Sequence, residues 1–366
     1  MGSCLKSMRR SGLAGGLAAV FAVGLLELGL VVTATTPSRA GDVTLVESGS
    51  TLLYPVFKIW AGEYEKTHSG VKITTTGTGS EKGIEEAISG AVQIGASDAY
   101  MSDAESRRNP NIVNVPMAIS AQTVNYNLPG LNDVNVKLDG QTLAGIYTGK
   151  VRSWDDKAIV ALNPDLKLPN NPIIPIRRAE GSGDTFVFTQ YLTFSTPSWE
   201  NSLGFGTAIR WPAVPGAIEA TGNEGMIEKL HETPYSVGYV GVSYHDDIAK
   251  AGLGTAALKS YDGEFLLPTP DSIAAASAAL GPRTPTDERL TLVNAPGANA
   301  YPLINYEYAI VSTKQADAGT AAAIRKFLHW ATAPDETNQK YLDDAHFIAL
   351  PAHIWVLSYD QIEKIK

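Results

Sequence analysis

Short runs of β-branched and apolar residues alternate along the chain with longer segments whose apolar residues recur at helical spacing. In the first such segment Phe57, Trp60 and Tyr64 share one face of a helix, and Pro55 stands where the first helical turn accepts proline. This alternation predicts an α/β protein with mixed sheets flanked by helices. The predicted strands cover residues 43–46, 71–74, 92–95, 173–176, 237–240 and 308–311. The predicted helices cover residues 54–67, 83–89, 141–147, 155–162, 185–194, 224–231, 271–280, 316–331 and 352–364.

Two clusters of proline and glycine interrupt this pattern, at residues 128–130 and 294–302. If the chain crosses between domains near both clusters, residues 41–122 plus 303–366 form one discontinuous domain and residues 123–302 form the other. Two crossings make a hinge, and the cleft between the domains is then the natural ligand site.

Residues 1–40 have the layout of a secretory signal peptide. Basic residues precede a mostly apolar run from 13 to 32, and small residues lead to Ser38-Arg39-Ala40, which is typical of a cleavage site. An uncleaved membrane anchor is the alternative, although Glu27 inside the run opposes insertion. Because the only cysteine, Cys4, precedes the run, the exported chain has no thiol chemistry, and we expect it in a bacterial periplasm or cell envelope.

The sequence carries a net charge of −9, and removal of residues 1–40 takes away four basic residues and one acidic residue, which leaves −12. Nucleic acids and anionic membrane surfaces are poor partners for that charge. A small anion can still bind, because solvent screens charges beyond about 10 Å while local dipoles and a buried cation act at shorter range.

Four segments combine glycine with hydroxyl or charged residues at strand-to-helix junctions. Glycine lets the backbone approach a ligand closely, and the unpaired N–H groups at a helix start bind oxyanions. Each segment alone has a structural explanation, because Ser50, Thr51, Ser80 and Asp184 are ordinary helix caps and Asp98 is compatible with the start of the next turn. Arg178 and Glu180 are compatible with a surface ion pair. The conjunction of the four predicts an anion site. The segments are Ser48-Gly49-Ser50-Thr51-Leu52, Gly77 to Gly83, Gly95-Ala96-Ser97-Asp98 and Arg178 to Thr185.

Taken together, these segments resemble the periplasmic phosphate-binding protein of the bacterial high-affinity phosphate ABC importer, and the resemblance runs from about Val43 to the C-terminus. The stretches from Gly181 to Leu192 and from Asn305 to Tyr308 are similar to mycobacterial members in particular. Outside the four loops, the resemblance rests on residues 138–143, 146–150, 154–156, 161–164 and 239–241.

This resemblance implies a two-domain binding protein of the type II-like fold, which closes by a hinge around its ligand. The implied ligand is inorganic phosphate, with arsenate as a weaker analogue, and the implied partners are the membrane subunits of an ABC importer. We therefore expect a monomer with no catalytic activity, no cofactor and no metal ion, which does not bind nucleic acid.

The resemblance also assigns ligand contacts residue by residue. Thr51 would offer its hydroxyl to the ion and Leu52 its backbone N–H. Arg178 would bind phosphate oxygens through its guanidinium, and Asp98 would accept a hydrogen bond from the ion. Further donors would come from Ser50, Ser80, Ser182, Gly183 and Asp184.

Three positions depart from many members of that family. Leu52 replaces a phenylalanine, a change that a main-chain donor tolerates. Glu180 replaces the aspartate that holds the arginine, and its extra methylene leaves its pairing with Arg178 open. Asp184 replaces a threonine. Because a carboxylate facing phosphate would repel it, we expect Asp184 to use its backbone N–H and to turn its side chain toward the helix cap.

Asp98 is expected to distinguish phosphate from sulfate. Phosphate keeps a proton on at least one oxygen at neutral pH, whereas sulfate has none, so a buried carboxylate accepts a hydrogen bond only from phosphate. An unpaired buried charge costs several kcal/mol, enough for a discrimination of thousands-fold or more. Arsenate also carries a proton and should be rejected much less well.

Other functions have less support in the sequence. The sequence contains no Gly-x-Ser-x-Gly elbow, no Walker loop and no His-x-x-x-His pair, which disfavours a serine hydrolase, a nucleotide-binding enzyme and a metalloenzyme. A phosphatase related to binding proteins remains an alternative. So does a binding protein for sulfate, molybdate or a phosphorylated organic molecule, although Asp98 argues against fully deprotonated anions. A structural envelope protein would not need four anion loops.

Overall fold

The computed structural model describes residues 42–366, so the expected signal peptide lies outside the described residues. The strands are β1 (Val43–Gly49), β2 (Val71–Gly77), β3 (Ile94–Ser97), β4 (Ile112–Tyr126), β5 (Lys137–Leu138), β6 (Ile174–Arg178), β7 (Ile218–Ala220), β8 (Ser236–Gly241), β9 (Gly254–Thr255), β10 (Ala257–Lys259), β11 (Phe265–Leu266) and β12 (Ile304–Ser312). The helices are α1 (Tyr54–Thr67), α2 (Ser80–Ser89), α3 (Asp103–Arg108), α4 (Gly140–Tyr147), α5 (Lys157–Leu162), α6 (Gly183–Ser195), α7 (Pro197–Glu200), α8 (Gly222–Glu232), α9 (His245–Lys250), α10 (Pro270–Leu280), α11 (Ala318–Ala331), α12 (Glu336–Asp344) and α13 (Ala352–Ile362), with short 3₁₀ turns η1 (Val242–Tyr244) and η2 (Gly281–Arg283).

Among residues 42–366, nine strands form one mixed sheet in the order β2-β1-β3-β12-β4-β8-β6-β7, with β9 paired to β4. β1 is parallel to both β2 and β3, and β6 is parallel to both β7 and β8. The antiparallel strands β12 and β4 lie between these two parallel groups. Strands β11, β10 and β5 form a smaller sheet. The prediction of an α/β protein with mixed sheets and flanking helices is confirmed.

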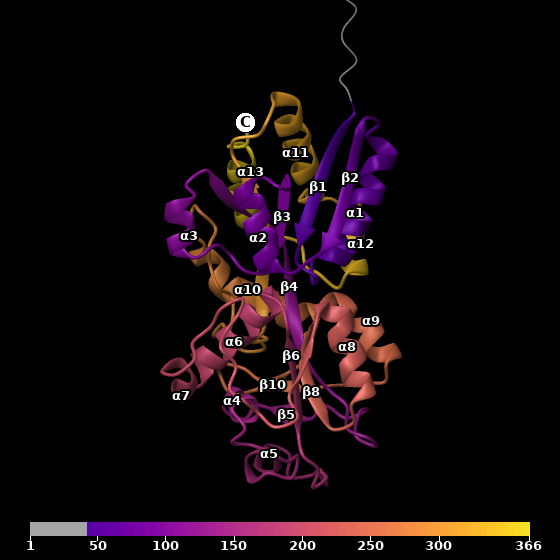
Figure 1. The fold of residues 1–366 in the computed structure, drawn as a ribbon, viewed down its shortest axis with the longest axis vertical. Coiled ribbons are helices and arrows are strands. Elements are labelled where there is room, and N and C mark those ends of the chain that lie inside the picture. The colour runs from indigo at the N-terminus through magenta and orange to yellow at the C-terminus, as the bar shows by residue number, and fades with distance from the viewer. Residues whose placement is uncertain (1–41) are drawn as a thin grey trace, which may run out of the picture. The chain divides into compact units, whose positions relative to one another are not determined.

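β4 contributes to both halves of the large sheet and is its longest strand, with 15 residues (Figure 1). Residues 112–121 of β4 pair with β12, and residues 122–126 pair with β8. The sequence does not predict this strand, because nearly all of it is buried and no alternation of exposed and buried positions marks it. At this change of partner, Gln122 Nε2 donates a hydrogen bond to Asp184 Oδ1 at 3.0 Å, which links the strand to one of the predicted anion loops.

Helix α1 begins and ends where the sequence predicts. Proline occupies its first turn, and Phe57, Trp60 and Tyr64 are buried on one face against the C-terminal helices, where Tyr64 meets Phe327 edge to face. The indole Nε1 of Trp60 donates a hydrogen bond to Asn338 Oδ1 at 2.9 Å, which ties α1 to α12. Helices that are distant in sequence thus pack together and against the sheet, with α1 against β2 and α11 against β1.

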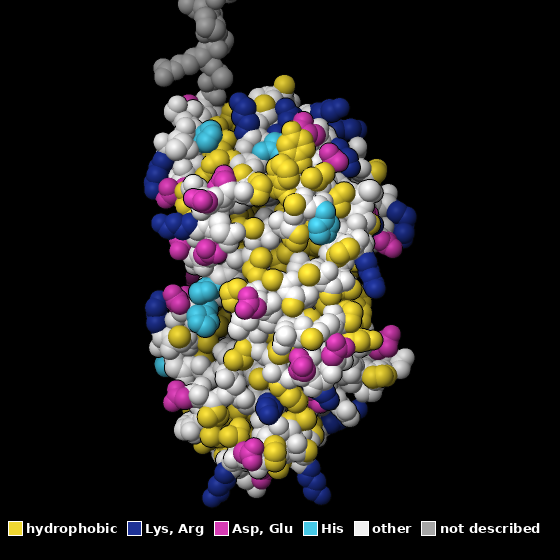
Figure 2. Space-filling model, turned by 180° about the vertical axis from the view of Figure 1, so that it is seen from behind, with side chains coloured by type: hydrophobic (Ala, Val, Ile, Leu, Met, Phe, Trp, Pro, Cys, Tyr) yellow, Lys and Arg dark blue, Asp and Glu magenta, His cyan; other side chains and the backbone are white. Residues whose placement is uncertain are grey.

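Acidic and basic side chains are interspersed on the face seen in Figure 2, with hydrophobic atoms between them. Of the helices formed by residues 42–366, none combines the length and apolarity that crossing a bilayer requires.

Candidate functional site

Each of the four predicted loops follows the carboxyl end of a strand that belongs to one of the two parallel groups of the large sheet. β1, β2 and β3 are parallel, and the chain leaves them at Ser50, Thr78 and Asp98, respectively. β6 ends at Arg178, beside β8 and β7. Loops at the carboxyl ends of parallel strands are where α/β proteins bind ligands. The topology therefore brings the two halves of the candidate site to the middle of the large sheet.

Asp98 is held by hydroxyl groups from the other two loops of its half-site. Its carboxylate is only 2% exposed and accepts hydrogen bonds from Ser50 Oγ and, at 3.3 Å, from Ser80 Oγ. Its backbone N–H donates to Ser80 Oγ at 3.1 Å. Ser50 Oγ also accepts from the N–H of Leu53 at 3.0 Å, so it fixes the start of α1 at the same time. The first three predicted loops therefore converge on one buried carboxylate.

Arg178 lies at the centre of the second half-site and is 3% exposed. Its Nε donates to Glu180 Oε1 at 2.7 Å, so Glu180 pairs with Arg178 despite its extra methylene. Glu180 Oε1 also accepts from the N–H of Gly222 at 3.0 Å. Arg178 Nη2 donates to Thr51 Oγ1 at 3.1 Å, and Nη1 donates to the carboxylate of Asp184. The guanidinium thus reaches from its own half-site to the loop that precedes α1.

The expectation for the side chain of Asp184 is wrong. Ser182, not Asp184, caps α6, because Ser182 Oγ accepts from the N–H of Thr185 at 3.4 Å. Asp184 is fully buried, and its carboxylate accepts from Arg178 and, at 3.0 Å, from Gln122 Nε2. A buried carboxylate needs charged and amide donors, and the cap position already has a hydroxyl. Asp184 therefore faces the site as an internal anion.

The two half-sites meet at Gly183. A Cβ atom there would lie 2.3 Å from Asp98 Oδ2 and 2.4 Å from Ser80 Oγ, so only glycine fits. Next to this contact, the N–H of Glu81 donates to the carbonyl of Gly181 at 3.2 Å. Leu52 is packed closely enough against Gly241 that a Cβ on Gly241 would lie 2.1 Å from Leu52 Cδ1. The structure therefore brings Ser80, Asp98 and Arg178 to the first turn of α6, with Thr51 bonded to Arg178 and Leu52 packed against the end of β8.

Residues 34–335 match the PBP superfamily domain. The phosphate-binding protein PstS of Haemophilus influenzae is 31% identical to this chain over 88% of the chain and 94% of that protein. This chain belongs to the PstS family of phosphate-binding proteins. The family resemblance noted in the sequence is thereby confirmed, and the mycobacterial likeness has a counterpart in PstS 3 of Mycobacterium leprae, which is 30% identical over 86% of this chain and 85% of that protein.

Solved structures establish the same fold for this PstS-family chain. A periplasmic phosphate-binding protein named PfluDING, solved with phosphate, superimposes with a TM-score of 0.69 at 19% identity and covers 86% of this chain and 92% of its own. A substrate-binding protein of a putative phosphate ABC transporter from Clostridium perfringens gives a TM-score of 0.60 at 18% identity, over 84% of this chain and all of its own. At these identities the likeness concerns the fold alone.

Buried carboxyl groups outnumber cations in the site of this PstS-family protein. Burial raises the pKa of Asp184 to about 7, opposed by the charge of Arg178 and reinforced by that of Asp98. Burial also raises the pKa of Asp98, although hydroxyl donors and Arg178 oppose the shift. The pKa of Glu307 is raised well above its ordinary value by burial and by the neighbouring charge of Asp98. An anion that enters this site therefore favours protonation of the surrounding carboxyl groups.

The sequence did not mark several residues that complete the site. Asn223 is the second residue of α8, which begins at Gly222, and this strand-to-helix junction with glycine has the same signature as the four predicted loops. Gln122 and Glu307 lie on β4 and β12, where only the pairing of the folded sheet brings them near the loops. Tyr239 on β8 accepts from the N–H of Arg178 at 3.2 Å and shares a hydrogen bond of 2.7 Å with Thr185 Oγ1.

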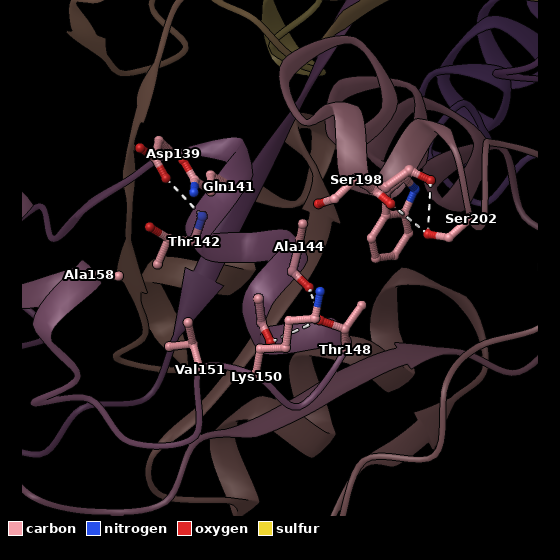
Figure 3. A pocket seen from close by; sticks show the side chains of 12 residues that line it. Asp139, Gln141, Thr142, Ala144, Thr148, Lys150, Val151, Ala158, Ser198 and Ser202 are labelled. Atoms are coloured by element: carbon pink, nitrogen blue, oxygen red, sulfur yellow. Dashed lines mark hydrogen bonds between the residues drawn. The ribbon is translucent and has the colours of Figure 1, made fainter.

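A pocket of about 390 Å³ lies away from these loops, between α4 and α7 (Figure 3). Several of its polar groups already serve helix ends and turns, since Asp139 accepts from the N–H of Thr142 at 2.8 Å and Thr148 Oγ1 donates to the carbonyl of Ala144 at 2.7 Å. None of its lining residues belongs to the four loops. This pocket is therefore separate from the four predicted loops.

Proposed function

We propose that this protein binds one inorganic phosphate ion between its four loops and delivers it to the membrane subunits of an ABC importer, without catalysing a reaction. The observation that carries the proposal is the convergence of Asp98 and Arg178 on the first turn of α6. There Gly183, which has no side chain, leaves room for Asp98 and Ser80. Membership of the PstS family supports the ligand, since the relatives are named as phosphate-binding proteins. In this role the protein acts in the periplasm or cell envelope after export.

The proposed contacts follow from chemistry at each position. Arg178 supplies a planar cation with several donors, which suits a tetrahedral oxyanion. The free N–H groups at the start of α6, from Gly183 and Asp184, point along the positive end of the helix dipole. Asp98 accepts a hydrogen bond from the protonated oxygen of the ion. Hydroxyl or backbone donors come from Ser50, Thr51, Leu52, Ser80 and Ser182, and Glu180 orients Arg178.

We further propose that residues 41–122 plus 303–366 and residues 123–302 are two domains that close on the ion. The change of partner along β4, from β12 at Ala121 to β8 at Gln122, supports this division. Some of the bonds that cross the proposed boundary lie at the site, such as Arg178 Nη2 to Thr51 Oγ1 at 3.1 Å and Glu81 N–H to Gly181 O at 3.2 Å. Others join residues 284–289 to the first domain, such as Tyr308 OH to Glu288 O at 3.0 Å. Phosphate would add further bonds of this kind and thus favour closure.

Calorimetry on protein unfolded, stripped of phosphate and refolded tests the proposed function. We expect tight binding of phosphate near one-to-one, weaker binding of arsenate and no heat with sulfate. Small-angle scattering of the same samples should show a smaller radius of gyration with phosphate, because the domains close. A clear response to sulfate with none to phosphate would refute the assignment of the ligand. Identical scattering curves with and without phosphate would refute the hinge.

Asp184 makes the affinity for phosphate depend on pH. A bound anion opposes ionisation of Asp184 and raises its pKa above the value of about 7 in the free site, so binding takes up a proton above pH 7. By linkage, affinity is expected to fall by up to about tenfold per pH unit as pH rises above 7, while Asp184 adds no dependence at lower pH, where it is already protonated. The titratable or charged groups that act on Asp184 are Arg178, Asp98, Tyr239 and Tyr244.

Asp184→Asn isolates this contribution from the ionisation of phosphate itself. The variant keeps the size of the side chain but has no charge, and its amide retains one acceptor oxygen in place of two. It should bind phosphate more tightly than the natural protein above pH 7 and similarly below it. Isothermal titrations from pH 5.5 to 8.5 give both profiles. If the two profiles stay parallel over this range, Asp184 does not titrate with phosphate binding.

A further inference from the structure

Asn223 contacts two candidate ligand residues with one side chain. It is fully buried, and its Nδ2 donates to Thr51 Oγ1 at 2.9 Å and to Asp184 Oδ2 at 2.8 Å. Its Oδ1 accepts from the N–H of Gly241 at 2.8 Å, at the end of β8. Both N–H groups of the amide nitrogen and the amide oxygen are therefore engaged in hydrogen bonds within the protein. Asn223 itself need not touch the ion to affect it.

Arg178 shares both acceptors with Asn223. Its Nη2 donates to Thr51 Oγ1 at 3.1 Å, and its Nη1 donates to the same oxygen of Asp184 that Asn223 contacts. A hydroxyl group has two lone pairs and one proton. Because Arg178 and Asn223 fill both lone pairs of Thr51 Oγ1, the hydroxyl proton must point elsewhere. The Thr51 hydroxyl can therefore act only as a hydrogen-bond donor toward a ligand, and an anion needs a donor.

The backbone of Thr51 is held separately from its side chain. Tyr244 OH donates to the carbonyl of Thr51 at 3.0 Å, and Ser243 Oγ donates to the carbonyl of Leu52 at 2.8 Å. Both donors lie just after β8, so their hydrogen bonds hold this loop in place even when the side chain of Asn223 is replaced. Loss of Asn223 should consequently change the direction in which the Thr51 hydroxyl points its proton more than it changes the position of the loop.

We propose that Asn223 is a positioning residue of the phosphate site, which makes the Thr51 hydroxyl a hydrogen-bond donor and holds Asp184 against Arg178. The proposal rests on the proposed function, because it concerns the same ion. It also gives Asn223 a place in domain closure: it belongs to the proposed second domain, together with Asp184, and bonds to Thr51 in the first.

A double-mutant cycle between Asn223 and Thr51 tests this role. Asn223→Ala is expected to weaken phosphate binding about tenfold to a hundredfold, as expected for loss of hydrogen bonds to a charged site. In a Thr51→Ala background the same change should cost much less, since Asn223 then has no hydroxyl to orient. Phosphate affinity of the four proteins is measured by calorimetry at pH 7. Additive effects of the two substitutions would overturn the proposal.

Asn223→Asp provides a second test with the shape of the side chain preserved. The introduced carboxylate accepts a hydrogen bond from Thr51 instead of donating one, and it faces Asp184, so phosphate affinity should fall further than in Asn223→Ala at pH 8. The deficit should shrink toward pH 5.5, where carboxyl groups next to one another protonate. A merely structural asparagine would give a deficit that does not depend on pH, which would contradict the proposal.

Asn125→Ala is the matched control. Asn125 is as fully buried as Asn223 and donates through Nδ2 to Thr255 Oγ1 at 3.1 Å, but its contacts lie on β4 and β9, outside the loops. It should lower the melting temperature and leave phosphate affinity within about twofold. If the natural protein fails to bind phosphate at all, the proposed function fails. If it binds and Asn223→Ala matches it in affinity, only the positioning role fails.

Discussion

Asp98→Asn is expected to lose most of the discrimination between phosphate and sulfate. In the natural protein the carboxylate of Asp98 is 2% exposed, and the hydroxyls of Ser50 and Ser80 donate to it. Its remaining lone pairs can accept a hydrogen bond from a protonated oxygen of phosphate but face only lone pairs on sulfate. The unfavourable contact with sulfate is worth several kcal/mol in a buried site, a factor of thousands in affinity.

An amide at position 98 reverses this relation. Its NH₂ group donates to any oxyanion, so sulfate should gain affinity by at least about a hundredfold, while phosphate loses a hydrogen bond to a charged acceptor and weakens by about tenfold. Competition titrations with phosphate and sulfate at pH 7.5 give the ratio directly. Arsenate, which is protonated like phosphate, should follow phosphate in both proteins.

Asp103→Asn serves as the control for the loss of one negative charge. Asp103 is 75% exposed and pairs with Arg289 at 2.9 Å on the surface, away from the loops. Its neutralisation should leave the ratio of phosphate to sulfate affinity unchanged, because solvent screens an exposed charge. If Asp98→Asn retains the ratio of the natural protein as well, the carboxylate does not select the ion, and the discrimination must come from another part of the site.

Local rules in the sequence predict the short elements of this fold better than its longest strand. α1 has the predicted bounds because a proline start and a regular apolar face act within one helix. β4 could not be predicted because its residues are buried on both faces, so apolar and polar residues do not alternate along it. Pro116 also stands within its sequence, and proline is unusual inside a strand. α12 is also missed, since its polar sequence offers only Leu342 and Asn338 to the interior.

The candidate site divides along the same line. Ser50, Ser80 and Asp98 could be predicted because glycine-rich loops after strands have a recognisable chemistry, and the structure gathers them. The orientation of Asp184 could not, because a helix cap and an ion pair are both reasonable for a residue at the start of a helix, and the choice depends on Arg178 from another strand. Glu307 enters the site only through the pairing of β12 with β4.

Arg178→Met is expected to abolish measurable phosphate binding and to destabilise the protein. The substitution removes the cation that the ion would contact and leaves the half-buried Glu180 and the buried Asp184 without a charged partner. Breaking a buried ion pair in this way costs roughly 3–5 kcal/mol in the free energy of unfolding. Phosphate affinity should fall by at least about a thousandfold. Calorimetry and denaturant unfolding measure the two losses.

The loss of stability should depend on pH with a definite sign. Arg178 lowers the pKa of Asp184, so its removal raises that pKa further above the unfolded value. The folded state then binds a proton more tightly than the unfolded state, and stability falls as pH rises from the unfolded pKa toward the folded one. The variant should therefore be less destabilised at pH 5.5 than at pH 8. A deficit in stability that is equal at both values would show that Asp184 is not the group left unpaired.

Arg178→Met combined with Asp184→Asn separates the two roles of the arginine. Without the buried carboxylate, the double variant should recover much of the stability at pH 8, because one uncompensated charge is gone. It should not recover phosphate binding, because no cation has returned to the site. Arg289→Met controls for the loss of a partly exposed arginine and should change neither quantity appreciably. If the double variant binds phosphate as well as Asp184→Asn does, Arg178 serves only to neutralise Asp184, and the ion is held by the hydroxyls and the start of α6.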